Sequence, residues 1–356
     1  MKQSSIVPAR DLAFPMHEIL NLPQPADIEM ATVSGPTTSL TLRGAVPGEP
    51  EASYFVKTLK KGTPPGPHLN LGLREVRFYA LIDSLSPDPY PNIPRCIKRH
   101  IRHDEGNYYL VLEDCSVSHQ SYERVDFNSL KPWKTALAAL ADFHRGFTQK
   151  LEADQIHALA DDRNKVEQYI QKLIAAFETF KTDHYDIMDD SVLSLMESLI
   201  PRIRAFELEK VDRINQNVLT TLLHRDAHLR NFLYPRSAGG RAVIVDWQFW
   251  GLGIGVFDLR PLLGSALPPE MRMEQETLVQ FYYEAALEGI EADYSWADCW
   301  NDYRKGVIDN LFMSVWQYTG FGWEFERWKD TLKSAVENYY AMDCEEITSQ
   351  YGMGDF

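Results

Sequence analysis

Residues 222–233 read LLHRDAHLRNFL, and residues 243–248 read VIVDWQ. In both stretches apolar residues surround the polar side chains Asp226, Asn231 and Asp246. A carboxylate, a carboxamide five residues later and a second carboxylate on the next strand can converge at one end of a short hairpin. Oxygen ligands of this kind suit Mg²⁺, which binds one or two carboxylates and leaves room for substrate phosphates. The two stretches therefore predict a site where a metal ion meets a phosphorylated substrate.

The same three side chains fit the chemistry of phosphoryl transfer. Asp226 can accept the proton of a substrate hydroxyl, while Asn231 and Asp246 hold the Mg²⁺ that bridges the nucleotide phosphates. Their spacing matches H-R-D-x-x-x-x-N, the catalytic-loop signature of the kinase fold. The simpler alternative is a set of capping and turn residues, because a single such residue is commonly a cap. Three in this order, each within apolar sequence, favour the catalytic interpretation.

The segment around Asp226 resembles the aminoglycoside phosphotransferase and choline kinase superfamily of small-molecule kinases. His228 follows Asp226 by two residues, as in the superfamily pattern H-G-D-x-H-x-x-N, and Asp246 precedes Trp-Gln instead of Phe-Gly. Residues 253–259 resemble the motif G-x-x-x-x-D-L and leave no space for an activation loop. Arg225 departs from the pattern, since it stands where glycine is usual. We expect it to reshape the loop beside the substrate without removing a catalytic group.

The resemblance also implies residues that bind the nucleotide. Lys57, in the strand-like run Tyr-Phe-Val-Lys, is placed like the lysine that contacts the phosphates, and Glu75 on the following helix like its acidic partner. Residues 110–114 resemble the hinge whose backbone groups hydrogen-bond adenine, which assigns Glu113 and Cys115 to that contact. ATP as co-substrate and Mg²⁺ as cofactor follow from this resemblance.

The loop that would cover the phosphates is the weakest match. Residues 34–39 contain one glycine and no GxGxxG pattern. Backbone N–H groups and the hydroxyls of Thr37, Thr38 and Ser39 are candidates to contact the β-phosphate. A plain hairpin turn is an equally open interpretation of this segment.

The order of the predicted elements indicates the fold class. Strand patterns occupy residues 39–43, 52–59, 96–103 and 108–112, and amphipathic helix patterns occupy 71–85, 132–147, 162–180, 192–206, 269–289 and 296–342. Strands followed by helices favour an α+β protein over a repeating βαβ sheet. With the resemblance, this predicts a bilobal protein-kinase-like fold. A nucleotide-binding lobe at 1–113, including an extension at 1–28, would precede a helical catalytic and acceptor-binding lobe at 114–356.

Composition limits the functional classes. The chain has 356 residues and a formal net charge of −15, which disfavours a nucleic-acid partner because an acidic surface repels phosphate backbones. Four scattered cysteines without a CxxC pair fit a reducing compartment and give no structural zinc site. No apolar run has the length of a signal peptide or a membrane span, so we expect a cytoplasmic protein with no membrane partner. The oligomeric state stays open.

Two other classes of function, and the identity of the acceptor, remain open at this point. His224, Asp226 and His228 could ligate a transition metal in a hydrolase. The chain could also be a non-catalytic binding protein with a kinase fold, although all three polar residues are intact. Five of the eight tryptophans fall in residues 296–328 among acidic residues. A cationic amino alcohol or aminoglycoside would use the carboxylates there, whereas a neutral or apolar alcohol would use the aromatic rings.

Overall fold

The structure is a computed structural model that describes residues 29–33, 37–43, 53–59, 66–86, 90, 92–102, 107–148 and 150–350. Its residues form two compact units, one from residues 1–126 and 230–250 and the other from residues 127–229 and 251–356. Residues 230–250, from the later part of the chain, thus belong with the N-terminal unit. A single boundary in the sequence cannot separate the two units. The division into lobes at residues 113 and 114 stays a prediction, and the predicted extension at 1–28 lies outside the described residues.

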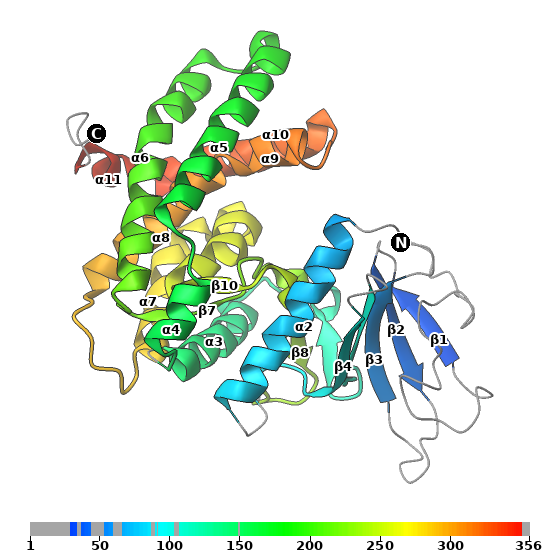
Figure 1. Cartoon of the computed structure of the whole chain (residues 1–356). Helices are drawn as coiled ribbons and strands as arrows, with labels where there is room; N and C mark the ends of the chain where they lie inside the picture. Colours follow the sequence, from blue (N-terminus) through cyan, green and yellow to red (C-terminus); the bar gives the residue numbers. More distant parts are fainter. Residues whose placement is uncertain are drawn as a thin grey trace. The chain divides into compact units, whose positions relative to one another are not determined.

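The first unit contains a five-stranded antiparallel sheet (Figure 1). In the order β1-β2-β3-β5-β4, its strands are Glu29–Val33, Thr37–Arg43, Ser53–Leu59, Asn107–Glu113 and Cys96–Arg102. Four of these strands match the predicted ones within two residues, and β1 is an addition. Six of the seven β5 residues are buried, because this strand lies between two others and beneath a helix.

Helix α2, Pro67–Leu85, packs on the sheet through its apolar face. Val76, Phe78 and Ile82 recur at helical spacing and are almost fully buried. Gly72 permits close approach of the helix, since a Cβ atom there would lie 2.0 Å from the ring of Tyr108 on β5. This close packing brings the face of α2 that carries Glu75 against the centre of the sheet.

A small sheet completes the first unit. Strand β8, Phe232–Pro235, pairs antiparallel with β6, His119–Ser121, and with β9, Val243–Ile244. The 3₁₀ turn η5, Trp247–Phe249, follows β9 after two residues. The Trp247 ring stacks on Phe78 of α2, with centroids 4.2 Å apart and planes inclined by 6°. Stacking and strand pairing therefore hold the 230–250 segment in this unit.

The second unit is mainly helical (Figure 1). Its helices are α3 (Leu130–Phe147), α4 (Ala153–Leu159), α5 (Arg163–His184), α6 (Asp190–Asn215), α7 (Gln275–Ala286), α8 (Trp296–Asn310), α9 (Met313–Thr319), α10 (Phe325–Ala341) and α11 (Cys344–Gln350). Helices α5 and α6 run side by side, and α3 packs against α7. Strand β7, Thr220–Leu223, pairs antiparallel with β10, Gly251–Ile254. The helical pattern at 296–342 becomes three helices, with a break at Gly322, whose φ of +62° suits glycine.

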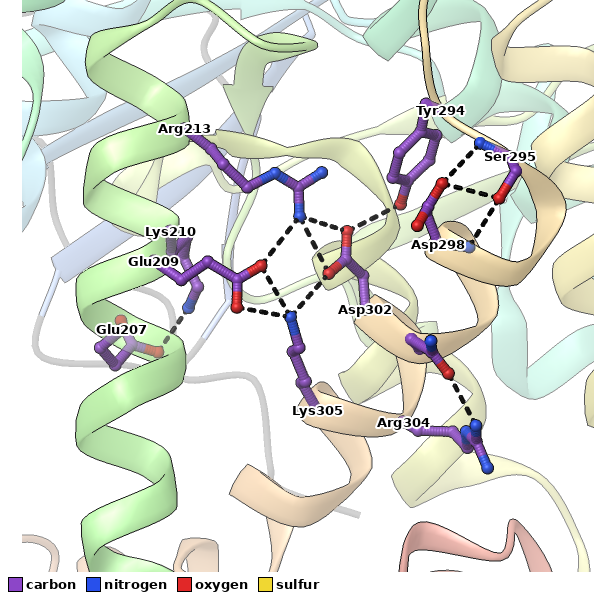
Figure 2. A network of polar contacts seen from close by, with 11 residues as sticks. Glu207, Glu209, Lys210, Arg213, Tyr294, Ser295, Asp298, Asp302, Arg304 and Lys305 are labelled. Carbon is purple, nitrogen blue, oxygen red and sulfur yellow. Dashed lines mark hydrogen bonds and ion pairs between the residues drawn. The ribbon is translucent and has the colours of Figure 1, made fainter. Parts of the chain in front are cut away.

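Helices α6 and α8 are joined by a buried network of charges (Figure 2). Asp302, with 1% of its surface exposed, accepts hydrogen bonds from Arg213 at 2.8 and 3.0 Å and from the Tyr294 hydroxyl at 2.9 Å. Lys305 donates to both oxygens of Glu209 at 2.9 Å and to Asp302 at 3.4 Å. Each charged group in the network has a partner of opposite charge, which offsets the free-energy cost of burying it.

These parts together confirm the predicted α+β class. Across the described residues, no helix is long and apolar enough to cross a membrane.

Candidate active site

Lys57, Glu75 and Asp246 meet in the first unit. The ammonium group of Lys57 on β3 lies 2.8 Å from each carboxylate oxygen of Glu75 on α2 and 2.7 Å from Oδ1 of Asp246. Lys57 and Glu75 are 8% and 2% exposed, so both side chains are buried. Burial alone would lower the pKa of Lys57, but the charges of Glu75 and Asp246 outweigh it and raise that pKa above 10.5. Lys57 is therefore a fixed positive charge.

Asn231 and Asp246 flank the same end of a strand pair. Asn231 precedes β8, and Asp246 follows β9 after one residue. The backbone carbonyl of Asn231 accepts a hydrogen bond from the Val245 N–H at 2.9 Å. Asp246 has a φ of +70°, a left-handed conformation that asparagine and aspartate tolerate better than most residues. The hairpin arrangement that the sequence suggested for these two side chains is present.

A cavity of about 630 Å³ in the first unit gathers most of the predicted nucleotide-site residues. Its walls include Lys57, Glu75, Glu113, Cys115, Asn231 and Asp246. Apolar surface comes from Phe55, Leu112 and Leu233. An apolar cavity with a few convergent polar groups is the usual form of a small-molecule site. Two carboxylate or carboxamide oxygen donors, from Asp246 and Asn231, line its wall and fit the requirements of Mg²⁺.

The segment after β5 has a defined backbone. Glu113 N–H donates to the Arg95 carbonyl at 2.9 Å, and His119 N–H donates to the Cys115 carbonyl at 2.8 Å. Ser116 N–H donates to the Asp114 carboxylate at 2.9 Å. These bonds hold the predicted hinge as a tight turn at the cavity wall.

The structure corrects the interpretation of residues 34–39 as one loop. Thr37, Thr38 and Ser39 belong to strand β2, where Ser39 lies opposite Lys57 of β3. The physical reason is that β-branched threonines favour a strand when a partner strand is present. Residues 34–36 lie outside the described residues.

Four further residues of the cavity wall were not anticipated. They are His119, Arg124, Arg230 and Arg236. Arg230 occupies an unspecified position within the kinase signature, and the other three belong to no recognisable motif. Strand β6, which carries His119, pairs with β8. The only local signal was the positive charge of the three arginines in an otherwise acidic chain.

Asp226 lies in the second unit, in the turn after β7. The carboxylate of Asp258 accepts hydrogen bonds from the backbone N–H groups of His224 at 2.6 Å and Arg225 at 2.7 Å. The Asp226 N–H donates to Nδ1 of His224 at 3.2 Å, and Nε2 of His228 lies 3.5 Å from the Asp226 carboxylate. The two backbone hydrogen bonds to Asp258 thus hold the turn that presents Asp226.

Asp258 is itself held by His144 of α3. Nε2 of His144 lies 3.2 Å from the carboxylate and donates to it, since an ionised carboxylate only accepts. Nδ1 of His144 lies 2.7 Å from the Tyr282 hydroxyl. Burial alone would raise the pKa of Asp258, but these donors and the nearby histidines bring that pKa below 3.8.

The structure explains how arginine replaces glycine at position 225. The φ of Arg225 is +64°, a left-handed conformation that glycine adopts without strain. Its guanidinium donates to the Leu252 carbonyl at 3.0 Å and to Asp161 at 3.3 Å. A Cβ atom on Gly251 would lie 2.3 Å from the guanidinium carbon, so the absence of a side chain at 251 makes room for Arg225.

The geometry argues against a metal-dependent hydrolase centred on His224, Asp226 and His228. His224 is completely buried, and its Nδ1 accepts the Asp226 N–H instead of facing a shared site. Among the residues that the structure describes, no three or more His, Cys, Asp or Glu side chains are arranged to hold a metal ion.

Of the five tryptophans in residues 296–328, Trp328 is buried and the other four are half-buried. Trp328 is 1% exposed and contacts Phe180 and Phe325 edge-on. Trp296 and Trp300 stack on each other with centroids 5.8 Å apart. Trp328 therefore belongs to the core, whereas Trp296 and Trp300 stack on each other where they are half-buried.

The fold is that of the small-molecule kinases. It is similar to a Plasmodium vivax ethanolamine kinase, with a TM-score of 0.56 at 13% identity over 94% of this chain and 87% of that chain. It is also similar to the GDP complex of an aminoglycoside 2′-phosphotransferase IIIa variant, with a TM-score of 0.59 at 13% identity over 94% and 97% of the two chains. A choline kinase from Streptococcus pneumoniae has a TM-score of 0.50 at 18% identity over 92% and 98%. These likenesses establish the predicted protein-kinase-like fold.

The family follows from the sequence. Residues 76–292, more than half of the chain, match the ecdysteroid kinase-like family, and the chain belongs to that family. No curated protein sequence matches it. Family and fold together identify a small-molecule kinase, a phosphotransferase with an alcohol group as acceptor.

Proposed function

We propose that this protein transfers the γ-phosphate of ATP, bound with Mg²⁺, to a hydroxyl group of a small molecule. The observation that carries the proposal is the cavity in which Lys57, paired with Glu75, meets Asn231 and Asp246. A triphosphate needs a fixed cation and metal ligands in one place, and this cavity supplies both kinds of group. The proposal also assigns residues 1–113 to a nucleotide-binding lobe and residues 114–356 to a catalytic and acceptor-binding lobe, which adds Cys115, Asn231 and Asp246 to the nucleotide site.

The residues of the cavity that the sequence predicted each have a task in this proposal. Glu75 holds the ammonium of Lys57, which contacts the α- and β-phosphates. The backbone at Glu113 and Cys115 binds adenine. Asp246 and Asn231 would hold Mg²⁺, which neutralises charge on the phosphates when it is bound. Most of the catalytic effect then comes from positioning and from stabilising charge.

Asp226 orients the acceptor hydroxyl and takes its proton. Its place in the chain supports this role, because it precedes the proposed metal ligand Asn231 by five residues, as in the kinase signature. Its turn is fixed by two backbone hydrogen bonds to Asp258, which keep a base ready in one conformation. General-base catalysis of this kind typically accelerates a reaction about 10²–10⁴-fold.

Substitution of Asp226 and of Asp246 distinguishes a role in phosphoryl transfer from a role in ATP binding. Asp226→Ala should lower the rate of phosphoryl transfer about 10²–10⁴-fold while nucleotide affinity stays nearly unchanged. Asp246→Ala should also lose the Mg²⁺-dependent part of ATP binding. The measurements are calorimetric titration with a non-hydrolysable ATP analogue, with and without Mg²⁺, and release of ADP with a panel of hydroxyl compounds. The family name makes an ecdysteroid a necessary member of that panel.

Asp212→Ala is the matched control, since this exposed aspartate pairs only with Arg163 among the ion pairs described for it. Normal turnover in Asp226→Ala would refute the assignment of the base. Nucleotide binding without transfer to any hydroxyl compound would favour the alternative of a non-catalytic binding protein.

A further inference from the structure

Three arginines next to the small sheet, Arg124, Arg230 and Arg236, line the cavity of the first unit. Arg236 is held at the hinge turn, since its guanidinium donates to the Ser116 carbonyl at 3.3 Å and its N–H donates to the Ser118 carbonyl at 2.9 Å. Arg124 and Arg230 are exposed, and within the described ranges of the chain neither side chain has an ion pair or a hydrogen bond. Their N–H donors are therefore available to a ligand in the cavity.

The register of the small sheet places Arg124 and Arg230 at the same end of it. Strand β6 runs antiparallel to β8, and Ser121 lies opposite Leu233. Arg124 ends a 3₁₀ turn that follows β6, three residues after Ser121, and Arg230 lies in a 3₁₀ turn before β8, three residues before Leu233. In an antiparallel pair the end of one strand meets the start of the other. Arg236 follows β8 and so lies at the opposite end, beside the hinge turn.

The end of the small sheet that carries Arg124 and Arg230 also carries the proposed metal ligands. Arg230 directly precedes Asn231, which a backbone hydrogen bond holds next to the segment that carries Asp246. Lys57, from β3 of the large sheet, lies 2.7 Å from Asp246. Phosphates bound at these groups would therefore meet Lys57 on the wall formed by the large sheet and the two arginines on the wall formed by the small sheet.

Charge balance distinguishes the two arginines from Lys57. The ammonium of Lys57 lies 2.8 Å from both carboxylate oxygens of Glu75 and 2.7 Å from Asp246, so its charge is compensated before any nucleotide binds. A triphosphate carries more negative charge than one Mg²⁺ ion offsets. Guanidinium groups suit the remaining charge, because their planar N–H donors can form two parallel hydrogen bonds to phosphate oxygens.

We propose that Arg124 and Arg230 bind the terminal phosphate of ATP and stabilise its charge during transfer. The inference rests on the proposed function and adds two catalytic residues to it. In the reaction the bond between the γ-phosphorus and the oxygen that bridges it to the β-phosphate breaks, and a bond forms from the acceptor oxygen to the γ-phosphorus. The electron pair of the broken bond stays on the β-phosphate of ADP, and the proton of the acceptor hydroxyl passes to Asp226. Charge spreads over the outer oxygens of the phosphoryl group as it moves, so donors aimed at these oxygens act most strongly in the transition state.

Two nucleotides that differ by the terminal phosphate test the inference. The Mg²⁺ complexes of ADP and of a non-hydrolysable ATP analogue are titrated into the full chain by calorimetry. Wild type should bind the analogue more tightly than ADP. Arg124→Gln and Arg230→Gln should each lower the affinity for the analogue about tenfold, the effect of losing one hydrogen bond between charged groups, and leave the affinity for ADP unchanged. The double variant should lower the affinity for the analogue further.

Turnover gives a second readout. In each of the two variants kcat with Mg·ATP should fall about 10²–10³-fold, more than the affinity for the analogue falls, because the donors act mainly on charge that develops in the transition state. Arg230→Lys keeps the charge and loses the planar pair of donors. It should retain the preference for the analogue over ADP, while its kcat stays below that of wild type.

Arg236→Gln is the matched control in the same cavity, since it removes an arginine from the hinge end of the small sheet. It should change the two affinities by the same factor, so that their ratio equals that of wild type. Arg163→Gln, at an exposed ion pair with Asp212 in the second unit, should change neither affinity.

An unchanged ratio of the two affinities in the double variant of Arg124 and Arg230 would overturn the inference. So would an equal loss of affinity for both nucleotides, or a shift of the ratio in Arg236→Gln as large as that in Arg230→Gln. Failure of the proposed function is a separate result. Wild type would then yield no phosphorylated product from Mg·ATP and any hydroxyl compound, whereas the ratio of affinities in the variants would still decide whether the two arginines bind the terminal phosphate.

Discussion

Asp258→Asn tests how the turn that carries Asp226 is held. The substitution preserves size but removes the negative charge. An asparagine has one acceptor oxygen, so its amide nitrogen would face one of the two backbone N–H groups that the carboxylate now accepts at 2.6 and 2.7 Å. Because Asp258 is 1% exposed, water cannot replace the lost partner.

The expected cost follows from these contacts. A hydrogen bond to a charged group contributes about 1.5–3 kcal/mol, and breaking a buried charge pair costs about 3–5 kcal/mol. We therefore expect Asp258→Asn to lower the free energy of unfolding by about 3–5 kcal/mol. For a unit of this size, that corresponds to a fall in melting temperature of roughly 10 °C. Thermal unfolding followed by circular dichroism at pH 7 measures it.

The loss should also depend on pH. Because the folded state lowers the pKa of Asp258 below 3.8, its contribution to stability is complete above that pH. The contribution disappears as pH falls through the lowered pKa and the carboxylate becomes protonated. The difference in melting temperature between wild type and Asp258→Asn should therefore be largest near neutral pH and shrink in acid.

Asp142→Asn is the matched control, because Asp142 lies on α3, the helix that carries His144, but pairs with Arg145 at the partly exposed surface. It should change the melting temperature little. Equal melting temperatures for the two variants at pH 7 would refute the argument that Asp258 clamps the turn.

Two further substitutions probe other buried charges. Glu75→Gln removes the charge that holds Lys57 and leaves Asp246 as its close anionic partner, so ATP affinity should fall about tenfold, or ~1.4 kcal/mol, by calorimetric titration; Glu197→Gln, at an exposed ion pair, should leave ATP affinity unchanged. Equal affinities in the two variants would contradict the role of Glu75. Asp302→Asn leaves Arg213 and Lys305 with less counter-charge between α6 and α8 and should cost about 3–5 kcal/mol in urea unfolding. A loss below about 1 kcal/mol would show that the network in Figure 2 adds little to stability.

The sequence alone was enough to predict the fold class and the residues proposed for catalysis. Apolar periodicity is a local property, so it located four strands of the five-stranded sheet and most of the long helices. The spacing of Asp226, Asn231 and Asp246 is also local, because a catalytic turn and a short hairpin each need only neighbouring residues. The expected place of Lys57 and Glu75 came from the resemblance to small-molecule kinases.

Tertiary structure decided which distant groups meet. Lys57 and Asp246 are 189 positions apart, and their contact depends on the packing of the 230–250 segment with the N-terminal unit. The support of Asp258 by His144, and the space that Gly251 leaves for Arg225, likewise leave no local pattern in the sequence. Each is a contact between residues that are far apart in the sequence. For the buried groups Lys57 and Asp258, an unpartnered charge would cost too much free energy, so the folded state must supply a partner. The sequence contains these residues, but only folding determines that they face one another.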